Sequence, residues 1–307
     1  MGSSWRTSKT WLFVSVLLFG MAPLAGAEPA AAPAKKPDAP TCDRAAFRVV
    51  VDVGHTEEVP GAKSARGAYE YDFNLALAKR VEQQLREAGF DRTILLVTHG
   101  HAHPSLAERV ARANASGADL FFSIHHDSVP DKFLEKWEYE GETRSYSDRF
   151  KGHSIFISNQ NADPRRSLQF ASLLGKQLKA RDLKYTPHYT QKFMGHRQRI
   201  LVDKDAGVYR YDQLIVLKDT RMPAVLLEAG SSINRDEELA MASPERQAKI
   251  SAAAVEAVDA YCAIQRPVRP AQEAHRSAAA PAAAPVAAKP SPAASILQFF
   301  SPAKRTQ

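Results

Sequence analysis

Short apolar runs alternate along this chain with longer stretches in which apolar residues recur every three or four positions. A short run of Val, Ile, Leu and Phe predicts a buried strand, and the wider spacing predicts an amphipathic helix. Strands are expected at 48–53, 93–98, 120–125, 153–158 and 224–228. Helices are expected at 74–88, 105–115, 165–180 and 244–262. The alternation predicts a single α/β domain with a mainly parallel, twisted sheet and helices on both faces.

The boundaries of the expected helices carry recognisable signals. Leu77 and Leu85 lie on one face of the first helix, and Gly89 is expected to end it. Ser105 and Glu108 have the spacing of a capping box, which predicts that the second helix begins at Ser105.

Three of the expected strands end on side chains that bind metals or transfer protons, namely His55, His125 and Glu228. Packing gives a buried apolar strand no reason to end on such residues, and ligands gather beyond the carboxyl ends of parallel strands. A catalytic zinc ion takes three His or Asp/Glu ligands and keeps one position for water, so one ligand is still needed. Glu70, one loop after His55, is the candidate. An ordinary acidic residue favouring a helix N-terminus is the alternative.

The beginning of the chain predicts export. Arg6 and Lys9 precede an apolar run, and small residues at 25–27 form a cleavage site, so residues 1–27 are expected to be a secretory signal peptide. No later stretch reaches the length of about 20 apolar residues that a membrane helix needs, so the mature chain is expected to have no membrane-spanning segment. The periplasm is the expected location.

Ala and Pro dominate two further segments, the linker at 28–41 and the tail at 266–307, which we expect to be disordered. The folded catalytic domain is therefore expected at 42–265. The net charge of +7 lies in the signal peptide and the tail, which leaves the domain near neutral and argues against nucleic acid as a partner. The basic tail is either a solvated linker or a contact for anionic envelope polymers or lipid headgroups, and its run at 295–300 is a candidate docking motif.

The two cysteines, Cys42 and Cys262, stand at the two ends of the expected domain. In an exported protein such a pair favours a disulfide that closes the domain.

Four motifs together resemble the zinc-dependent N-acetylmuramoyl-L-alanine amidases over roughly residues 47–263. They are DVGH at 52–55, GAYEYDFNLALA at 67–78, SIHHD at 123–127 and VLLEAGSSINRDEE at 225–238. The resemblance implies that His55, Glu70 and His125 bind one zinc ion and that Glu228 is the catalytic carboxylate. It also implies hydrolysis of the amide between N-acetylmuramic acid and L-alanine in peptidoglycan, for cell-wall remodelling or daughter-cell separation.

The doubled histidine of the third motif needs a choice between its two members. Neighbouring side chains of a strand point to opposite faces, so only one of them reaches a metal at the strand end. The Ser-Ile-His phase of the family selects His125. His126 and Asp127 then become candidates for supporting a ligand or lining the cleft, and Lys218 is a candidate for contact with substrate.

The sequence also departs from the family pattern. Thr56 and Glu57 replace a frequent Gly-Gly, so Glu57 and Glu58 are alternatives to Glu70 as a ligand, although Glu70 alone precedes the Asn-Leu-Ala helix. Residues 129–152 resemble an insertion beside the site. Some relatives carry a regulatory helix that blocks the zinc until a protein activator displaces it, and 129–213 has room for such a plug, near 137–141 or in the helix after 163. A wall of the substrate groove is the alternative.

Other histidines are weaker candidates. Alternating histidines at 99, 101 and 103 suggest either an adventitious metal site or a surface loop, and His188 and His196 are candidates for the cleft wall. Two rival functions also fit the sequence. One is a zinc peptidase that cuts stem peptides, and the other is a peptidoglycan-binding protein without catalysis.

Overall fold

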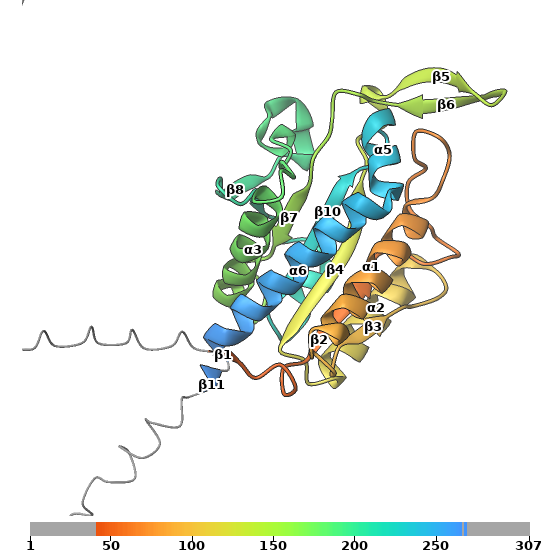
Figure 1. The fold of residues 1–307 in the computed structure, drawn as a ribbon. Coiled ribbons are helices and arrows are strands. Elements are labelled where there is room, and N and C mark those ends of the chain that lie inside the picture. Colours follow the sequence, from red (N-terminus) through yellow and green to blue (C-terminus); the bar gives the residue numbers. More distant parts are fainter. Residues whose placement is uncertain (1–40, 266, 269–307) are drawn as a thin grey trace, which may run out of the picture. The chain divides into compact units, whose positions relative to one another are not determined.

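The computed structural model describes residues 41–265 and 267–268 (Figure 1). The expected signal peptide, the linker as far as residue 40 and the candidate docking motif at 295–300 lie outside the described residues. Among the residues that are described, no helix has both the length and the apolar character needed to cross a membrane.

A seven-stranded sheet forms the centre of the domain, in the order β3-β2-β4-β10-β7-β9-β8. Its strands are β2 (Val49–Val53), β3 (Ile94–Leu96), β4 (Leu120–Asp127), β7 (Ser154–Ile157), β8 (Ile200–Asp203), β9 (Val208–Arg210) and β10 (Ala224–Ser231). Parallel pairing joins β3, β2, β4 and β10, and β7 pairs antiparallel with β10. The predicted α/β domain with a mainly parallel sheet is confirmed.

Helices cover both faces of this sheet. They are α1 (Glu70–Glu87), α2 (Ala102–Ala115), α3 (Pro164–Lys179), α4 (Ile215–Lys218), α5 (Arg235–Ala242) and α6 (Pro244–Gln265). Short 3₁₀ turns add η1 (Asp131–Phe133), η2 (His188–Thr190) and η3 (Lys192–Arg197). Helices α1, α6 and α3 lie side by side on one face (Figure 1), and α2 and α4 pack on the other.

Strand β2 shows how the sequence produces this layered core. Its residues VVVDV are all buried, as expected for a central parallel strand. Val49, Val51 and Val53 pack under α1 and α6, whereas Val50 packs on the opposite face with Phe121 and the α2 side. Each fully buried side chain of this kind contributes about 1.5–3 kcal/mol. The two apolar layers therefore fix the register of the strands that carry the site.

Two helix starts differ from the sequence prediction. Helix α1 begins at Glu70, four residues earlier than expected. Helix α2 begins at Ala102, and Ser105 is a buried residue of its first turn whose hydroxyl donates to the carbonyl of Ala102 at 3.0 Å. The predicted capping box is wrong, because its serine satisfies a local carbonyl inside the helix instead of an orphan N–H at its start.

The expected insertion at 129–152 forms η1 and a separate antiparallel hairpin of β5 (Glu135–Tyr139) and β6 (Glu142–Tyr146), which projects above α5 (Figure 1). The indole N–H of Trp137 donates to the carbonyl of Ala65 at 3.0 Å. The guanidinium groups of Arg66 and Arg235 lie 5.4 and 5.1 Å from the Trp137 ring centroid. Cation–π contacts and one hydrogen bond therefore anchor the hairpin to the domain.

The predicted disulfide is confirmed. Cys42 of β1 (Thr41–Cys42) is bonded to Cys262 near the end of α6. Strand β1 also pairs antiparallel with β11 (Pro267–Val268), which lies beyond the expected domain end at 265. The bond and the two-stranded ladder tie the first described residues to the last.

Replacing both cysteines by serine is expected to lower the free energy of unfolding by about 3–5 kcal/mol, because the bond joins residues that are 220 positions apart. The measurement compares denaturant unfolding of the C42S/C262S variant with that of the oxidised wild type. The reduced wild type is the control and should behave like the variant. Equal midpoints for the variant and the oxidised protein would contradict a stabilising bond.

Candidate metal centre

Three predicted ligands come together at the carboxyl edge of the sheet. His55 follows β2, Glu70 begins α1 and His125 lies in β4. Glu70 Oε2 lies 2.9 Å from His55 Nε2, and Glu70 Oε1 lies 2.9 Å from His125 Nδ1. Among the described residues this is the one group of three such side chains whose ligand atoms all lie within 4.8 Å of one another.

Parallel pairing delivers the two histidines to this edge. Strands β2 and β4 pair as far as Val53 and Ile124, and the N–H of Gly54 donates to the carbonyl of Ile124 at 3.0 Å. A Cβ on Gly54 would lie 2.4 Å from His125 Nε2, so the close approach of the chain to the imidazole requires glycine here. His55 then adopts φ 67°, a left-handed conformation that costs a non-glycine residue about 1–3 kcal/mol.

A buried polar network holds the strained backbone at His55. The Arg109 guanidinium, from α2, donates to the carbonyl of His55, and its Nε donates to Thr98 Oγ1 at 2.9 Å. Asp52 Oδ2 lies 3.7 Å from Arg109 Nη1 and accepts a hydrogen bond from Ser123 at 2.7 Å. The arginine thus links the backbone of the first candidate ligand to the core beneath it.

Glu70 is ionised in this setting. Burial raises its pKa, but the hydrogen bonds and charges of His125 and His55 outweigh burial and hold the pKa well below its usual range. Asn74, one turn along α1, donates to Glu70 Oε1 at 3.3 Å. One carboxylate between two imidazoles is a donor set that suits zinc, so these residues fit the metal that the resemblance implies.

The two adjacent histidines point to opposite faces of β4, as the alternation predicts. His126 Nδ1 lies 2.8 Å from Asn74 Oδ1, away from His55, and burial lowers the pKa of His126 to about 3, so its ring is neutral. Asn74 Nδ2 also donates to the carbonyl of Gly54 at 3.2 Å. The His126 backbone N–H donates to Glu70 Oε1 at 3.4 Å, but its ring is linked to Glu70 only through Asn74, which is a supporting position and not a ligand position.

Glu228 stands opposite His125, because the parallel register of β10 and β4 pairs these two residues. Burial, and then the negative charges of Asp127 and Glu70, raise the pKa of Glu228 well above its ordinary value, while Arg197 acts in the opposite direction. The described residues offer Glu228 Oε2 no hydrogen-bond partner. A carboxyl group that favours its proton and has an unengaged oxygen is suited to acid/base chemistry.

Sequence reasoning missed the residues that surround Asp127. Tyr189 donates to Asp127 Oδ2 at 2.7 Å, and Arg197 donates to Asp127 Oδ1 at 3.3 Å and to the Tyr189 hydroxyl at 3.2 Å. The position of Asp127 in the sequence predicted that it would support a ligand or line the cleft. In the structure its carboxylate bonds to Tyr189 and Arg197 and not to a ligand imidazole, and it thereby anchors η2 and η3 beside Glu228. Together η2 and η3 form one wall of the site. The apolar residues of 187–199 follow no helix or strand period, so the local sequence contained no signal for this wall.

The remaining histidine candidates divide by burial. His188 is the first residue of η2 and thus part of this wall, with its Nε2 3.7 Å from Asp127 Oδ2, and burial followed by the charges of Arg197 and Arg149 lowers its pKa to about 4. His196 is exposed, and so are the residues of the alternating set, His99, His101 and His103. The alternating set forms no group with metal-binding spacing among the described residues.

Other candidates lie apart from the centre. The Glu58 carboxylate accepts from the Gly100 N–H at 2.8 Å, and Glu57 is exposed; neither joins the two histidines. Lys218 is at the wrong end of the sheet for substrate contact. It precedes the start of β10, and the neighbouring carbonyl of Asp219 accepts a hydrogen bond from Asn114 at the end of α2.

Two segments were candidates for a plug over the metal centre, and neither makes a hydrogen bond or ion pair to its ligands within the described residues. Residues 137–141 belong to the anchored hairpin, and the helix after 163 is α3, which packs in the core. Within the described part of the chain, no hydrogen bond or ion pair joins residues 129–213 to His55, Glu70 or His125. Regulation by a displaced segment stays a prediction.

A small cavity of about 130 Å³ adjoins the metal centre. Its lining includes His55 and His125, and Val59, Ala102 and Leu106 supply apolar surface. Its size and lining suit a single small apolar group next to the two histidines.

Known proteins resemble this chain over most of the described residues. The chain is 29% identical to the uncharacterized protein YqiI of Bacillus subtilis over 214 residues, which is 69% of this chain and 84% of YqiI. It is 27% identical to N-acetylmuramoyl-L-alanine amidase AmiA of Escherichia coli over 239 residues, covering 69% of this chain and 75% of AmiA.

The fold has solved counterparts. The catalytic domain of CwlV, an N-acetylmuramoyl-L-alanine amidase from Bacillus (Paenibacillus) polymyxa var. colistinus, superposes with a TM-score of 0.51 at 25% identity. The match covers 70% of this chain and 97% of that domain. Residues 49–260 match the family described as N-acetylmuramoyl-L-alanine amidase, which is more than half of the sequence. The chain therefore belongs to the N-acetylmuramoyl-L-alanine amidase family.

Proposed function

We propose that this protein is an exported, periplasmic zinc amidase that cleaves the bond between N-acetylmuramic acid and L-alanine in peptidoglycan. The observation that carries the proposal is the ionised Glu70 carboxylate between His55 and His125, with Glu228 paired opposite His125. Cell-wall remodelling or daughter-cell separation is the corresponding role. An activating protein partner, which the resemblance implies, stays a prediction.

His55, Glu70 and His125 would hold the zinc ion. A zinc ion bound there supplies Lewis acidity, which polarises the scissile carbonyl and lowers the pKa of a bound water. The protein's own contribution is to keep the three ligands in place before the metal arrives. Arg109 fixes the backbone of His55, and Asn74 links Glu70 to the neutral ring of His126.

Glu228 would transfer the protons of the reaction. Its Oε2, which has no partner among the described residues, accepts the proton of the attacking water and later donates it to the leaving amine nitrogen. The positive charge of Arg197 lowers the pKa of Glu228, in opposition to burial and the charges of Asp127 and Glu70, which raise it. The 130 Å³ cavity beside the histidines has room for a methyl group such as the side chain of L-alanine.

A Glu228→Gln variant is expected to keep its zinc and lose activity by about 10²–10⁴-fold, because the amide cannot carry the water proton. The measurement is release of soluble products from purified peptidoglycan, with their masses. The wild type should release stem peptides that keep L-alanine. Glu138→Gln, an exposed position on the hairpin, is the matched control and should retain full activity.

The product masses also separate the rival functions. Shortened stem peptides from the wild type would contradict the amidase and favour a peptidase. Full activity of the Glu228→Gln variant would contradict the assigned role of Glu228. No turnover by a zinc-loaded wild type would favour a binding protein without catalysis.

His125→Ala and His126→Ala are expected to differ in zinc content, although the two residues are neighbours. Loss of His125 removes a ligand, so bound zinc should fall from about one ion per chain to near zero. Loss of His126 removes only the support of Asn74, and zinc affinity should fall by about 10–100-fold. The measurement is metal analysis with competition by a chelator. Zinc retained by His125→Ala but lost from His126→Ala would reverse the assignment.

A further inference from the structure

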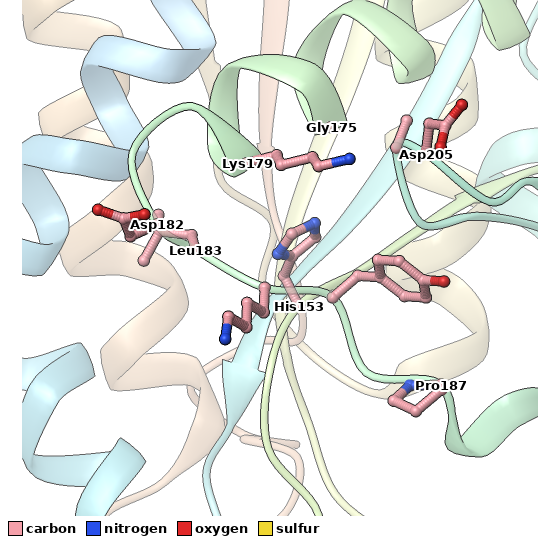
Figure 2. A pocket seen from close by; sticks show the side chains of 10 residues that line it. His153, Gly175, Lys179, Asp182, Leu183, Pro187 and Asp205 are labelled. Carbon is pink, nitrogen blue, oxygen red and sulfur yellow. The ribbon is translucent and has the colours of Figure 1, made fainter.

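A second cavity, larger than the one at the metal centre, lies beside the end of α3 (Figure 2). It has a volume of about 580 Å³, which falls within the range of roughly 300–1,000 Å³ that is usual for small-ligand sites. His153, immediately before β7, forms part of its lining. Nothing in the proposed amidase reaction uses this cavity.

The cavity lies on the opposite face of the sheet from the Glu228 carboxyl. Ser154 pairs with Glu228 in the antiparallel register of β7 and β10, and paired residues point to the same face. His153 precedes Ser154, so its side chain points to the other face. A ligand here would occupy a site separate from the metal centre, next to a strand that pairs with the catalytic position.

Close packing gives the cavity a fixed wall. A Cβ on Gly175 of α3 would lie only 2.0 Å from the carbonyl oxygen of Ala206, so the helix and the turn before β9 approach each other as closely as backbone allows. Leu183, Tyr185 and Pro187 add apolar surface. A cavity bounded by backbone contacts of this kind is present before any ligand arrives.

His153 supplies an unpartnered polar group to this wall. Its side chain is only 3% exposed, and the backbone of Ala206 and Lys184 lies beside the ring, but neither ring nitrogen makes a hydrogen bond of good geometry in the described part of the chain. Burial, and then the charge of Arg246, lower its pKa to about 4, against opposing effects of the backbone at Ala206 and Lys184. The ring is therefore neutral, with one N–H to donate and one nitrogen to accept.

The charged residues of the lining are balanced in sign. Lys179 and Lys184 are positive, and Asp182 and Asp205 are negative. None of the four forms an ion pair within the described residues. All four are exposed, and Figure 2 shows Lys179, Asp182 and Asp205 on different sides of His153, with the two carboxylates turned away from its imidazole. Such a lining does not suit a purely anionic or purely cationic ligand, but it suits one that carries both charges.

We propose that this cavity binds a short peptide of two or three residues with a free amino terminus, a free carboxyl terminus and a small apolar side chain. The lysines would receive the carboxylate, the aspartates the ammonium group, and the apolar wall the side chain. His153 would bond to a peptide amide, which is both a donor and an acceptor. This site does not depend on the amidase reaction, because it lies on the other face of the sheet.

The test measures binding of the tripeptide Ala-Leu-Ala to the full-length Glu228→Gln protein by calorimetry. Its N-acetylated and C-amidated forms, which lack one charge each, should bind at least about fivefold more weakly. Stem peptides purified from amidase-digested peptidoglycan form a second arm. Saturable binding in either arm supports the site, and the tighter arm identifies the source of the ligand.

Variants locate the binding. Lys179→Ala and Asp205→Ala should each weaken it by at least about threefold, whereas Lys176→Ala should not, because Lys176 lies one turn earlier on α3 and outside the lining. The His153 ring resonances should shift on addition of peptide, a readout that needs no variant of this buried residue. No saturable binding in either arm, or binding that capping and both lining variants leave unchanged, would overturn the proposal.

Discussion

The parallel pairing of β2, β4 and β10 is the constraint on which the rest of the site depends. It places His55, His125 and Glu228 at one edge of the sheet, and Glu70 reaches the same edge because α1 begins where the loop after β2 returns. Apolar layers on both faces set the register, and a slip of one residue in β4 would exchange His125 for His126. The chemistry of the site is thus fixed by packing far from it.

This arrangement carries a local cost in folding free energy. His55 is left-handed, Asp52 and Arg109 are buried beneath it, and Glu228 is a buried carboxyl among other acids. Each feature is unfavourable by itself. Arg109 holds the His55 backbone, and Arg109 and Ser123 stabilise Asp52, whereas only the charge of Arg197 favours the ionised form of Glu228. Such compensated strain is typical of functional sites, where stability is exchanged for a prepared geometry.

The sequence predicted the strands and helices that have a local pattern of apolar and polar residues. It did not predict segments whose positions depend on contacts with residues far away in the sequence. The buried strands ending on His55, His125 and Glu228 stand out because apolar runs end on polar residues, and the structure brings these residues together. The wall of Tyr189 and Arg197 carries no such pattern, because its position depends on hydrogen bonds to Asp127, 62 and 70 residues away in sequence. Lys218 was a candidate for substrate contact because it is close in sequence to β10. It lies at the start of that strand, whereas Glu228 lies toward its carboxyl end.

The most direct test of the metal centre is anomalous X-ray scattering at the zinc absorption edge, from crystals of protein purified without chelator. We expect one strong peak within bonding distance of His55, Glu70 and His125, with the His126 ring turned away toward Asn74. Absence of a peak between these three residues, or a peak at His99, His101 and His103 instead, would contradict this expectation.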